Sequence, residues 1–412
     1  MGKMRFVVPQ RERVPDHSLQ RAYLAGIEYI PWLSRCYWQD DLLVAKRDVN
    51  DSCNLYIPWN VSDYGELVLS TTSLMEREQP YNLPVELARG TINRLRNQLA
   101  QWEAAGFKAT DELIACVRTA TEQFVVAATS QGDSATAAEK ADEAITHALA
   151  AIKMLGRAYT QQVLDLQHQQ SEKLPTLLGS SVGTTPLAKG KAEAFLSAFN
   201  TAVIPLSWRD VEPEEGTFQW DAVDAQLEWC KEAGLRRCSG PLLRIDKGNL
   251  PDWIYLWEED FESLESYFLR YLRQVVNRYG GQLQIWQVAA GMNVDGAMAL
   301  SEQDKLRLTV AAIETVRQAD SKTPIVVTFD QPWAEYLAVR DLDLSPVHFA
   351  DYLVRADLGV AGIGLEINFG YWPGGTLPRE AIEISRQIDY WHTILGLPLL
   401  IMLTIPSSDE KD

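Results

Sequence analysis

The chain has 412 residues, enough for two or three domains of ordinary size, and 46% of them are hydrophobic and 23% charged. This composition is typical of globular proteins, so collagen-like and disordered classes are excluded, and no run is long and apolar enough to predict a membrane span. The net charge of −18 repels the phosphates of nucleic acids and of anionic lipids, so we expect neither nucleic acid nor membrane as a partner.

The cysteines and histidines indicate neither disulfides nor a metal site. The five cysteines are scattered and form no C-x-x-C pair, which fits buried thiols in a reducing compartment. The five histidines have no carboxylate or cysteine at ligand spacing, so we expect no metal. No glycine-rich phosphate motif follows an early strand, and we expect no cofactor. Because the first residues lack a signal-peptide run, we expect a cytoplasmic protein.

Residues 1–80 predict a small antiparallel β module. Short runs rich in β-branched and aromatic residues, such as MRFVV, CNLYIPW and ELVLSTT, are separated by turn signals. Eight aromatic residues either fill the core of this module or provide a platform that stacks on sugar rings. They are Tyr23, Tyr29, Trp32, Tyr37, Trp38, Tyr56, Trp59 and Tyr64.

Residues 81–173 predict a helical hairpin. Apolar residues recur at steps of three and four from Val85 to Trp102, with a stop at Gly106, and again from Ala141 to Tyr159. Such seams pack helices against each other and against a neighbour, and the alternative is a coiled coil that binds a partner. No residue of this segment suggests chemistry.

Residues 174–412 alternate seven apolar runs with amphipathic helical stretches. Nearly continuous apolar strands separated by helices are typical of a parallel sheet covered by helices. The pattern predicts an α/β fold, a (β/α)8 TIM barrel with seven visible units, in preference to a doubly wound sheet. The runs cover residues 177–182, 199–208, 236–245, 283–290, 324–329, 362–369 and 398–405.

An eighth barrel unit is missing, because only PSSDEKD follows Ile405. Seven strands leave two open edges, which natural proteins avoid. We expect the sequence to be a fragment; the alternatives are that the β module or another chain supplies the closing element.

Several strings in this last segment resemble glycoside hydrolase family 10, the xylanase family. The string FNTAVIPLSWRDVEPEEGTFQWDAVD is similar to the family's second-strand region, and LPDWI is similar to its L-P-x-W. In the same order and spacing, VVNRYGGQLQIWQVAAG, GIGLEIN and LGLPLLIMLTI resemble the strings of its later strands. The resemblance implies the barrel fold, a carbohydrate partner, either oligosaccharide or polysaccharide, and hydrolysis of O-glycosidic bonds.

The two catalytic glutamates of family 10 have no counterpart in this chain. Retaining glycosidases use one carboxyl group as acid/base and a second as nucleophile, about 5 to 5.5 Å apart. The resemblance puts Gly291 at the acid/base position and Leu403 at the nucleophile position. Glycine has no proton to donate and leucine cannot attack an anomeric carbon, so we do not expect the family mechanism.

Other polar and aromatic side chains follow the predicted strands, where barrel enzymes hold their active sites. Glu366 is the first catalytic candidate, because a buried carboxylate facing Asp330 would have a raised pKa and serve as a displaced acid or base. The alternative is that Glu366 pairs with Arg244 or Arg209 in a polar network. Asp330, the second candidate, otherwise caps its loop. The candidate substrate-binding residues are Trp208, Asp246, Asn293, Gln331, Trp333, Asn368 and Trp372.

Three functions remain open from the sequence. The first is a divergent glycoside hydrolase that acts through Glu366 and Asp330. The second is a non-catalytic carbohydrate-binding pseudoenzyme that keeps the barrel and an aromatic cleft. The third is an intracellular scaffold that uses the helical hairpin.

Overall fold

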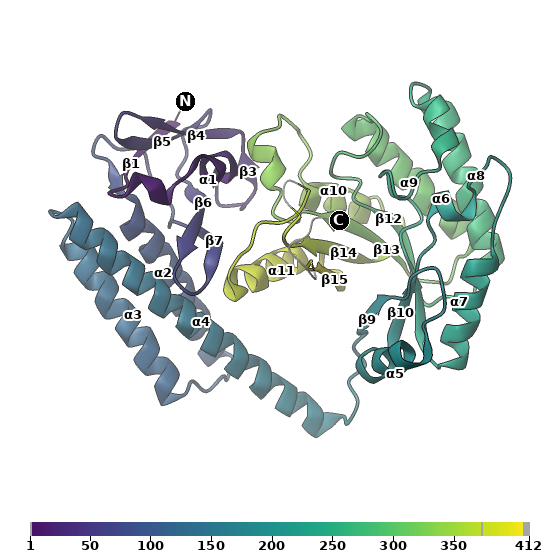
Figure 1. Ribbon diagram of the computed structural model, residues 1–412, viewed down its shortest axis with the longest axis horizontal. Helices are drawn as coiled ribbons and strands as arrows, with labels where there is room; N and C mark the ends of the chain where they lie inside the picture. The colour runs from purple at the N-terminus through teal and green to yellow at the C-terminus, as the bar shows by residue number, and fades with distance from the viewer. Residues whose placement is uncertain (1, 372–373, 407–412) are drawn as a thin grey trace.

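The computed structural model describes residues 2–371 and 374–406 of the chain. Figure 1 shows the β-rich N-terminal segment and the helices that follow it on one side of the molecule, and parallel strands with their own helices on the other. The long helix α4 (Ser134–Gln170) leads from the first part to the second. Helix α11 (Ala381–Leu395) belongs to the second part but packs against α4 and α2 (Leu83–Ala104).

The N-terminal segment forms two four-stranded sheets with the orders β4-β5-β1-β8 and β3-β2-β6-β7. The pairing is antiparallel, as the sequence predicted, except that β1 and β8 run parallel. A 3-10 turn η1 (Arg11–Arg13) and helix α1 (Asp16–Arg21) follow β1. The strands are β1 (Gly2–Val7), β2 (Tyr23–Ala25), β3 (Pro31–Trp32), β4 (Ser34–Gln39), β5 (Leu42–Arg47), β6 (Asn54–Val61), β7 (Gly65–Ser70) and β8 (Tyr81–Asn82).

The aromatic residues of this segment divide between the core and the surface. Tyr23 and Tyr56 are buried and their rings stack at 4.7 Å, and Trp59 is fully buried. These three side chains fill the core, as one of the two interpretations predicted. Tyr29 differs, because its side chain is 36% exposed on the turn after β2.

Three helices follow the β strands: α2, α3 (Asp111–Thr129) and α4. The structure therefore adds α3 to the two helical segments that the sequence predicted. Helix α3 buries only Leu113, Ala120 and Ala127, so it lacks the continuous apolar seam that makes a helix recognisable in a sequence. The predicted seams of α2 and α4 are buried inside the molecule, which favours packing within the chain over a partner-binding coiled coil.

The seven predicted apolar runs all form parallel strands. The sheets β11-β10-β9 and β12-β13-β14-β15 are joined by isolated parallel bridges, Cys238 to Ile285 and Leu243 to Ala289. The strands are β9 (Gly179–Ser181), β10 (Thr201–Ile204), β11 (Arg236–Ser239), β12 (Trp286–Ala290), β13 (Ile325–Asp330), β14 (Val360–Asn368) and β15 (Leu399–Thr404).

Helices connect these strands and cover the sheet. Among the described residues, none of the helices is both long and apolar enough to cross a bilayer. Besides α11, they are α5 (Lys189–Ala198), α6 (Trp208–Val211), α7 (Asp221–Glu232), α8 (Phe261–Tyr279), α9 (Glu302–Ala319) and α10 (Pro346–Arg355), with 3-10 turns η2 (Asp252–Trp257) and η3 (Glu335–Ala338).

The ring of strands is open between β9 and β15. Within residues 2–371 and 374–406, neither strand pairs on its outer edge, and no strand of the β module pairs with either of them. The β module therefore does not supply the closing element in this part of the chain. Along β15 and just beyond it, Ile401, Leu403 and Ile405 are exposed.

A buried ion pair ties the barrel segment to the β module. Arg379 Nη1 lies 2.7 Å from Glu335 Oε1, and both side chains are almost completely buried. Arg379 Nη2 also donates to the hydroxyl of Tyr23 at 2.9 Å. A charge buried to this extent is stable only while its partner stays in place, so the pair fixes how the two parts sit together.

We expect Arg379→Met to lower the free energy of unfolding by about 3–5 kcal/mol, because it leaves Glu335 buried without a counter-charge. The matched control is Arg355→Met, which removes an exposed ion pair with Asp351 one helical turn away and is expected to cost less than about 1 kcal/mol. Urea unfolding of both variants measures the difference. Equal losses would contradict a buried pair at Arg379.

Helix α2 lies unusually close to strand β7. A Cβ atom added to Gly90, in the middle of α2, would lie 1.9 Å from the carbonyl oxygen of Ser70. That oxygen belongs to the backbone and cannot move aside as a side chain would. Glycine therefore permits the close contact between this helix and this strand.

We expect Gly90→Ala to destabilise the protein by about 1–3 kcal/mol through this clash, although alanine normally favours a helix over glycine by about 1 kcal/mol. Gly156 in α4 is the control, since an added Cβ meets nothing within 4 Å. Gly156→Ala is expected to stabilise the protein slightly. Chemical denaturation measures both changes, and a gain in both variants would rule out the close contact.

Candidate functional site

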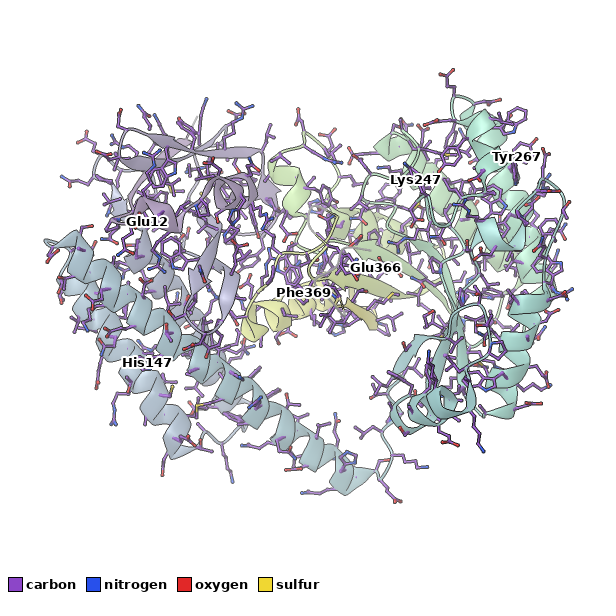
Figure 2. The ribbon with its side chains drawn as sticks, viewed as in Figure 1. Glu12, His147, Lys247, Tyr267, Glu366 and Phe369 are labelled. Carbon is purple, nitrogen blue, oxygen red and sulfur yellow. The ribbon has the colours of Figure 1, made fainter. Side chains whose placement is uncertain are left out.

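The carboxyl ends of β11 to β14 carry a connected polar network. Arg244, in the segment after β11, donates from Nη1 to both carboxylate oxygens of Glu366 at 2.9 Å, and from Nε to Asp246 at 2.8 Å. Glu366 lies on β14 and is buried, and Figure 2 shows it on the sheet formed by β12–β15. The carboxylate of Glu366 is thus held by Arg244, whereas Arg209 pairs with Asp252.

Asp330 lies next to Glu366 on the neighbouring strand. The two residues are register partners of β13 and β14, so their side chains point to the same face of the sheet. Asp330 Oδ1 accepts hydrogen bonds from the backbone N–H of Gln331 at 2.7 Å and from Asn368 at 2.9 Å. Burial, together with the negative charge of Glu366, raises the pKa of Asp330 to about 6. Asp330 therefore changes protonation near neutral pH.

Asn293 holds the end of β13 in place. Its side chain accepts from the backbone N–H of Asp330 and donates to the carbonyl oxygen of Asp330. It also donates to the hydroxyl of Tyr336 at 3.1 Å. The candidates Asn293, Asp330, Glu366 and Asn368 are thus brought together. Tyr336 joins them, and sequence reasoning missed it because nothing in the string FDQPWAEY marks its ring as buried beside Asn293.

The two positions that the resemblance assigns to the catalytic glutamates lie on β12 and β15. Gly291 follows β12 with a φ of +65°, and a Cβ atom built there would lie 3.9 Å from the guanidinium carbon of Arg244. Leu403 pairs with Ile367 across the sheet and its side chain is 59% exposed at the open edge. Neither side chain offers an ionisable group.

Two of the candidate tryptophans lie in the interior. Trp208 is 1% exposed, stacks on Tyr271 and donates from Nε1 to Glu212 at 2.8 Å. Trp333 is 3% exposed and lies under the guanidinium of Arg379 at 4.4 Å. Because neither ring face is accessible, we correct both assignments: these side chains pack the structure and are not open to a sugar. Strand-end position alone did not reveal their burial.

The other candidate substrate-binding residues differ in where they lie. Asp246 accepts from the backbone N–H groups of Gly248 and Asn249, so it shapes its turn as well as pairing with Arg244. Gln331 is buried, with a φ of +48°, directly after β13. Trp372 lies outside the described residues. Among the described residues no group of three or more His, Cys, Asp and Glu side chains is arranged to hold a metal ion.

The family model described as Glycosyl hydrolase family 10 matches residues 170–307. The predicted resemblance to family 10 is confirmed. The family 10 segment begins at the end of α4 and reaches into α9, so it contains Gly291 and ends before Leu403. The predicted fold class, the α/β fold of a (β/α)8 TIM barrel, is confirmed with it, although the described strands do not close the ring.

Solved structures of family 10 proteins are similar at low sequence identity. A GH10 endoxylanase from a sugarcane soil metagenome has 15% identity and a TM-score of 0.44, covering 57% of this chain and 68% of that one. Xylanase 10B from Thermotoga maritima has 18% identity and a TM-score of 0.44, with coverages of 57% and 72%. GH10 from Paenibacillus barcinonensis has 17% identity and a TM-score of 0.45, with the same coverages. Similarity this distant carries no conclusion about activity.

The raised pKa of Asp330 predicts a pH-dependent contribution to stability. The folded protein holds a proton there up to about pH 6, whereas the unfolded chain releases it near pH 4. This contribution is fully present below about pH 4 and is lost as the pH rises through 6. Asp330→Asn keeps an oxygen that accepts both hydrogen bonds and removes the titration. We expect the variant to be about 3 kcal/mol more stable than wild type at pH 8 and equal to it near pH 4.

Urea unfolding between pH 4 and 8 measures this difference, and a carbon-13 NMR titration of the aspartate carboxyl groups reports the pKa itself. Stability curves that run parallel for the two proteins at all pH values would show that Asp330 has an ordinary pKa.

Proposed function

We propose that the protein binds a carbohydrate at the mouth of its family 10 barrel and does not cleave it by the two-glutamate mechanism. The observation that carries the proposal is the state of the two catalytic positions. Gly291 and Leu403 have no acidic group, and the positive charge of Arg244 lies beside Gly291. What the mouth keeps is a set of hydrogen-bonding side chains held in fixed positions, the kind of group that orients a ligand in a binding site.

The pairing of Glu366 with Arg244 supports binding over catalysis. A nucleophilic carboxylate needs a free oxygen that can approach the anomeric carbon. Both oxygens of Glu366 already accept from Arg244, and its side chain is buried. Tyr371, which is 46% exposed on the loop after β14, offers an aromatic surface for the apolar face of a sugar ring.

Hydrolysis through Asp330 and Glu366 is the second candidate function. One observation favours it: an Asp330 pKa of about 6 suits a general acid at neutral pH. It also requires a second, unpaired carboxylate across the glycosidic bond. Glu366 lies next to Asp330 on the same face of the sheet, but its carboxylate forms an ion pair with Arg244 and is therefore not the unpaired carboxylate that hydrolysis requires.

Turnover and binding measured on the same protein separate the two functions. We expect no release of product from xylan or from 4-nitrophenyl β-xyloside above the uncatalysed rate, and heat of binding with xylobiose in calorimetry. Tyr371→Ala is expected to weaken that binding about threefold to tenfold, as the loss of one aromatic contact does.

Two results would contradict the proposal that the protein binds a carbohydrate without cleaving it. Turnover that Glu366→Gln and Asp330→Asn both abolish would establish the displaced-carboxylate hydrolase and end the binding-only proposal. No turnover together with no binding of xylobiose at about 10 mM would reject a xylose-based ligand at the barrel mouth.

A further inference from the structure

A polar cleft lies outside the barrel, where the β module meets α2 and α11. It has a volume of about 630 Å³, within the range of about 300–1,000 Å³ usual for small-molecule sites. Its walls carry many neutral amide and hydroxyl side chains, including Asn54, Asn93, Asn97, Gln98, Gln101 and Thr393. We propose that this cleft binds a neutral saccharide, at a site separate from the barrel mouth.

One amide of the cleft wall is open to a ligand. Gln98 lines the cleft and its residue is only 4% exposed, yet its side chain has no hydrogen-bond partner among the described residues. Neither amide atom of Gln98 is fully enclosed, so both can be reached from the cleft. A ligand hydroxyl that both donates and accepts would satisfy the carbonyl and the amino group of Gln98 together.

The neighbouring turn of α2 extends this hydrogen-bonding wall. Asn93, Asn97 and Gln101 are spaced at four-residue steps, so their side chains line one face of the helix. Asn97 donates to Asn93 at 2.9 Å, which orients both amides, and all three side chains are exposed. A row of oriented amides matches the adjacent hydroxyl groups of a sugar.

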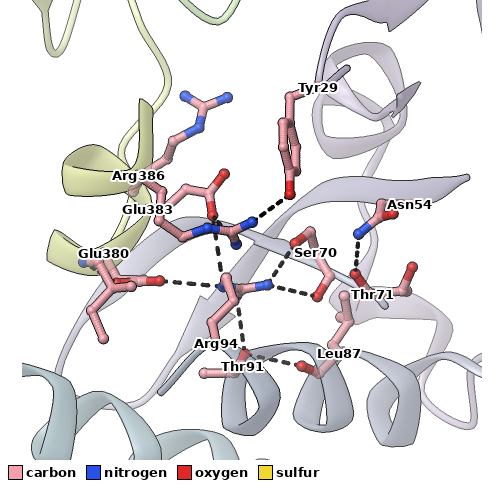
Figure 3. Close-up of polar contacts among 12 residues, drawn as sticks. Tyr29, Asn54, Ser70, Thr71, Leu87, Thr91, Arg94, Glu380, Glu383 and Arg386 are labelled. Atoms are coloured by element: carbon pink, nitrogen blue, oxygen red, sulfur yellow. Dashed lines mark hydrogen bonds and ion pairs between the residues drawn. The ribbon is translucent and has the colours of Figure 1, made fainter. Parts of the chain in front are cut away.

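Aromatic rings form the opposite wall. Tyr29 and Tyr390 both line the cleft, with ring centroids 5.9 Å apart in an edge-on arrangement. Arg386 donates to the Tyr29 hydroxyl at 2.6 Å and so holds the half-exposed ring in place, as Figure 3 shows. Tyr29 also has a φ of +58°, an unusual conformation for a bulky residue. A fixed aromatic face opposite a row of amides is suited to stack on one side of a sugar ring while the other edge is hydrogen-bonded.

The charges of the cleft favour a neutral ligand over an anion. Arg94 is buried and its guanidinium bonds to Glu380 and Ser70, and Arg386 lies 3.7 Å from Glu383. Asp389 adds a further negative charge to the lining. Both guanidinium groups of the lining are already paired with carboxylates, so within the described part of the chain the cleft has no unpaired cation to attract a phosphate or a uronic acid.

Direct binding measurements test this proposal on the full chain. The probes are xylotriose, cellotriose and maltotriose, with trigalacturonate as the anionic comparison. We expect at least one neutral trisaccharide to bind more tightly than trigalacturonate. Gln98→Leu is expected to weaken that binding about threefold to tenfold, the effect of losing one hydrogen bond.

Two further variants test whether the trisaccharide binds in the cleft. Asn97→Ala changes an exposed helical residue and so keeps the fold even where Gln98→Leu lowers stability, and it is expected to weaken binding to a similar extent. Tyr371→Ala is expected to weaken only binding at the barrel mouth, so the binding that Asn97→Ala weakens and Tyr371→Ala does not is assigned to the cleft.

Three outcomes would overturn the proposal. They are no binding of any neutral trisaccharide at about 10 mM, tighter binding of trigalacturonate, and binding that Tyr371→Ala abolishes while Asn97→Ala leaves it intact.

Discussion

The structure depends on the burial of two arginines where the β module, the helices and the barrel meet. Arg379 pairs with Glu335 and bonds to Tyr23, and Arg94 pairs with Glu380 and bonds to Ser70. Each guanidinium group takes its partners from segments far apart in the chain. Because an unpaired charge cannot remain buried at this depth, separating the parts would cost far more than any single apolar contact.

Helix α11 contacts both parts of the molecule. One of its faces covers the barrel strands, where Trp391 packs against Phe329, and another faces α2 and the β module. The polar cleft lies along that second contact, with Arg386 and Tyr390 from α11 and Asn97 and Gln98 from α2. A barrel helix that would otherwise face solvent thereby becomes one wall of a cleft, and the chain has two separate places where sugars are proposed to bind.

The sequence predicted the strands well and the site only in part. All seven apolar runs of the last segment became parallel strands. The central strands β12 and β13 are buried along their whole length, which explains their continuous apolar runs, whereas β9 and β15 at the open edges are partly exposed. Glu366 and Asp330 were predicted to face each other, and their register on neighbouring strands places them so. Trp208 and Trp333 were assigned to a ligand site but are buried, since position at a strand end does not tell which way a large ring turns. Helix α3 was missed because it buries mainly alanines.

The sequence by itself determined the order of strands and helices in the last segment, the family 10 resemblance, and the absence of acidic residues at the two positions which that resemblance marks as catalytic. These properties are local: they follow from residue type and spacing along the chain. Only the tertiary structure decided that Arg244 holds Glu366, that Gln98 lines a cleft without a hydrogen-bond partner among the described residues, and that Tyr29 lies across that cleft from α2. Such facts depend on contacts between residues tens to hundreds of positions apart, and neither hydrophobic periodicity nor a motif encodes which of these distant side chains meet.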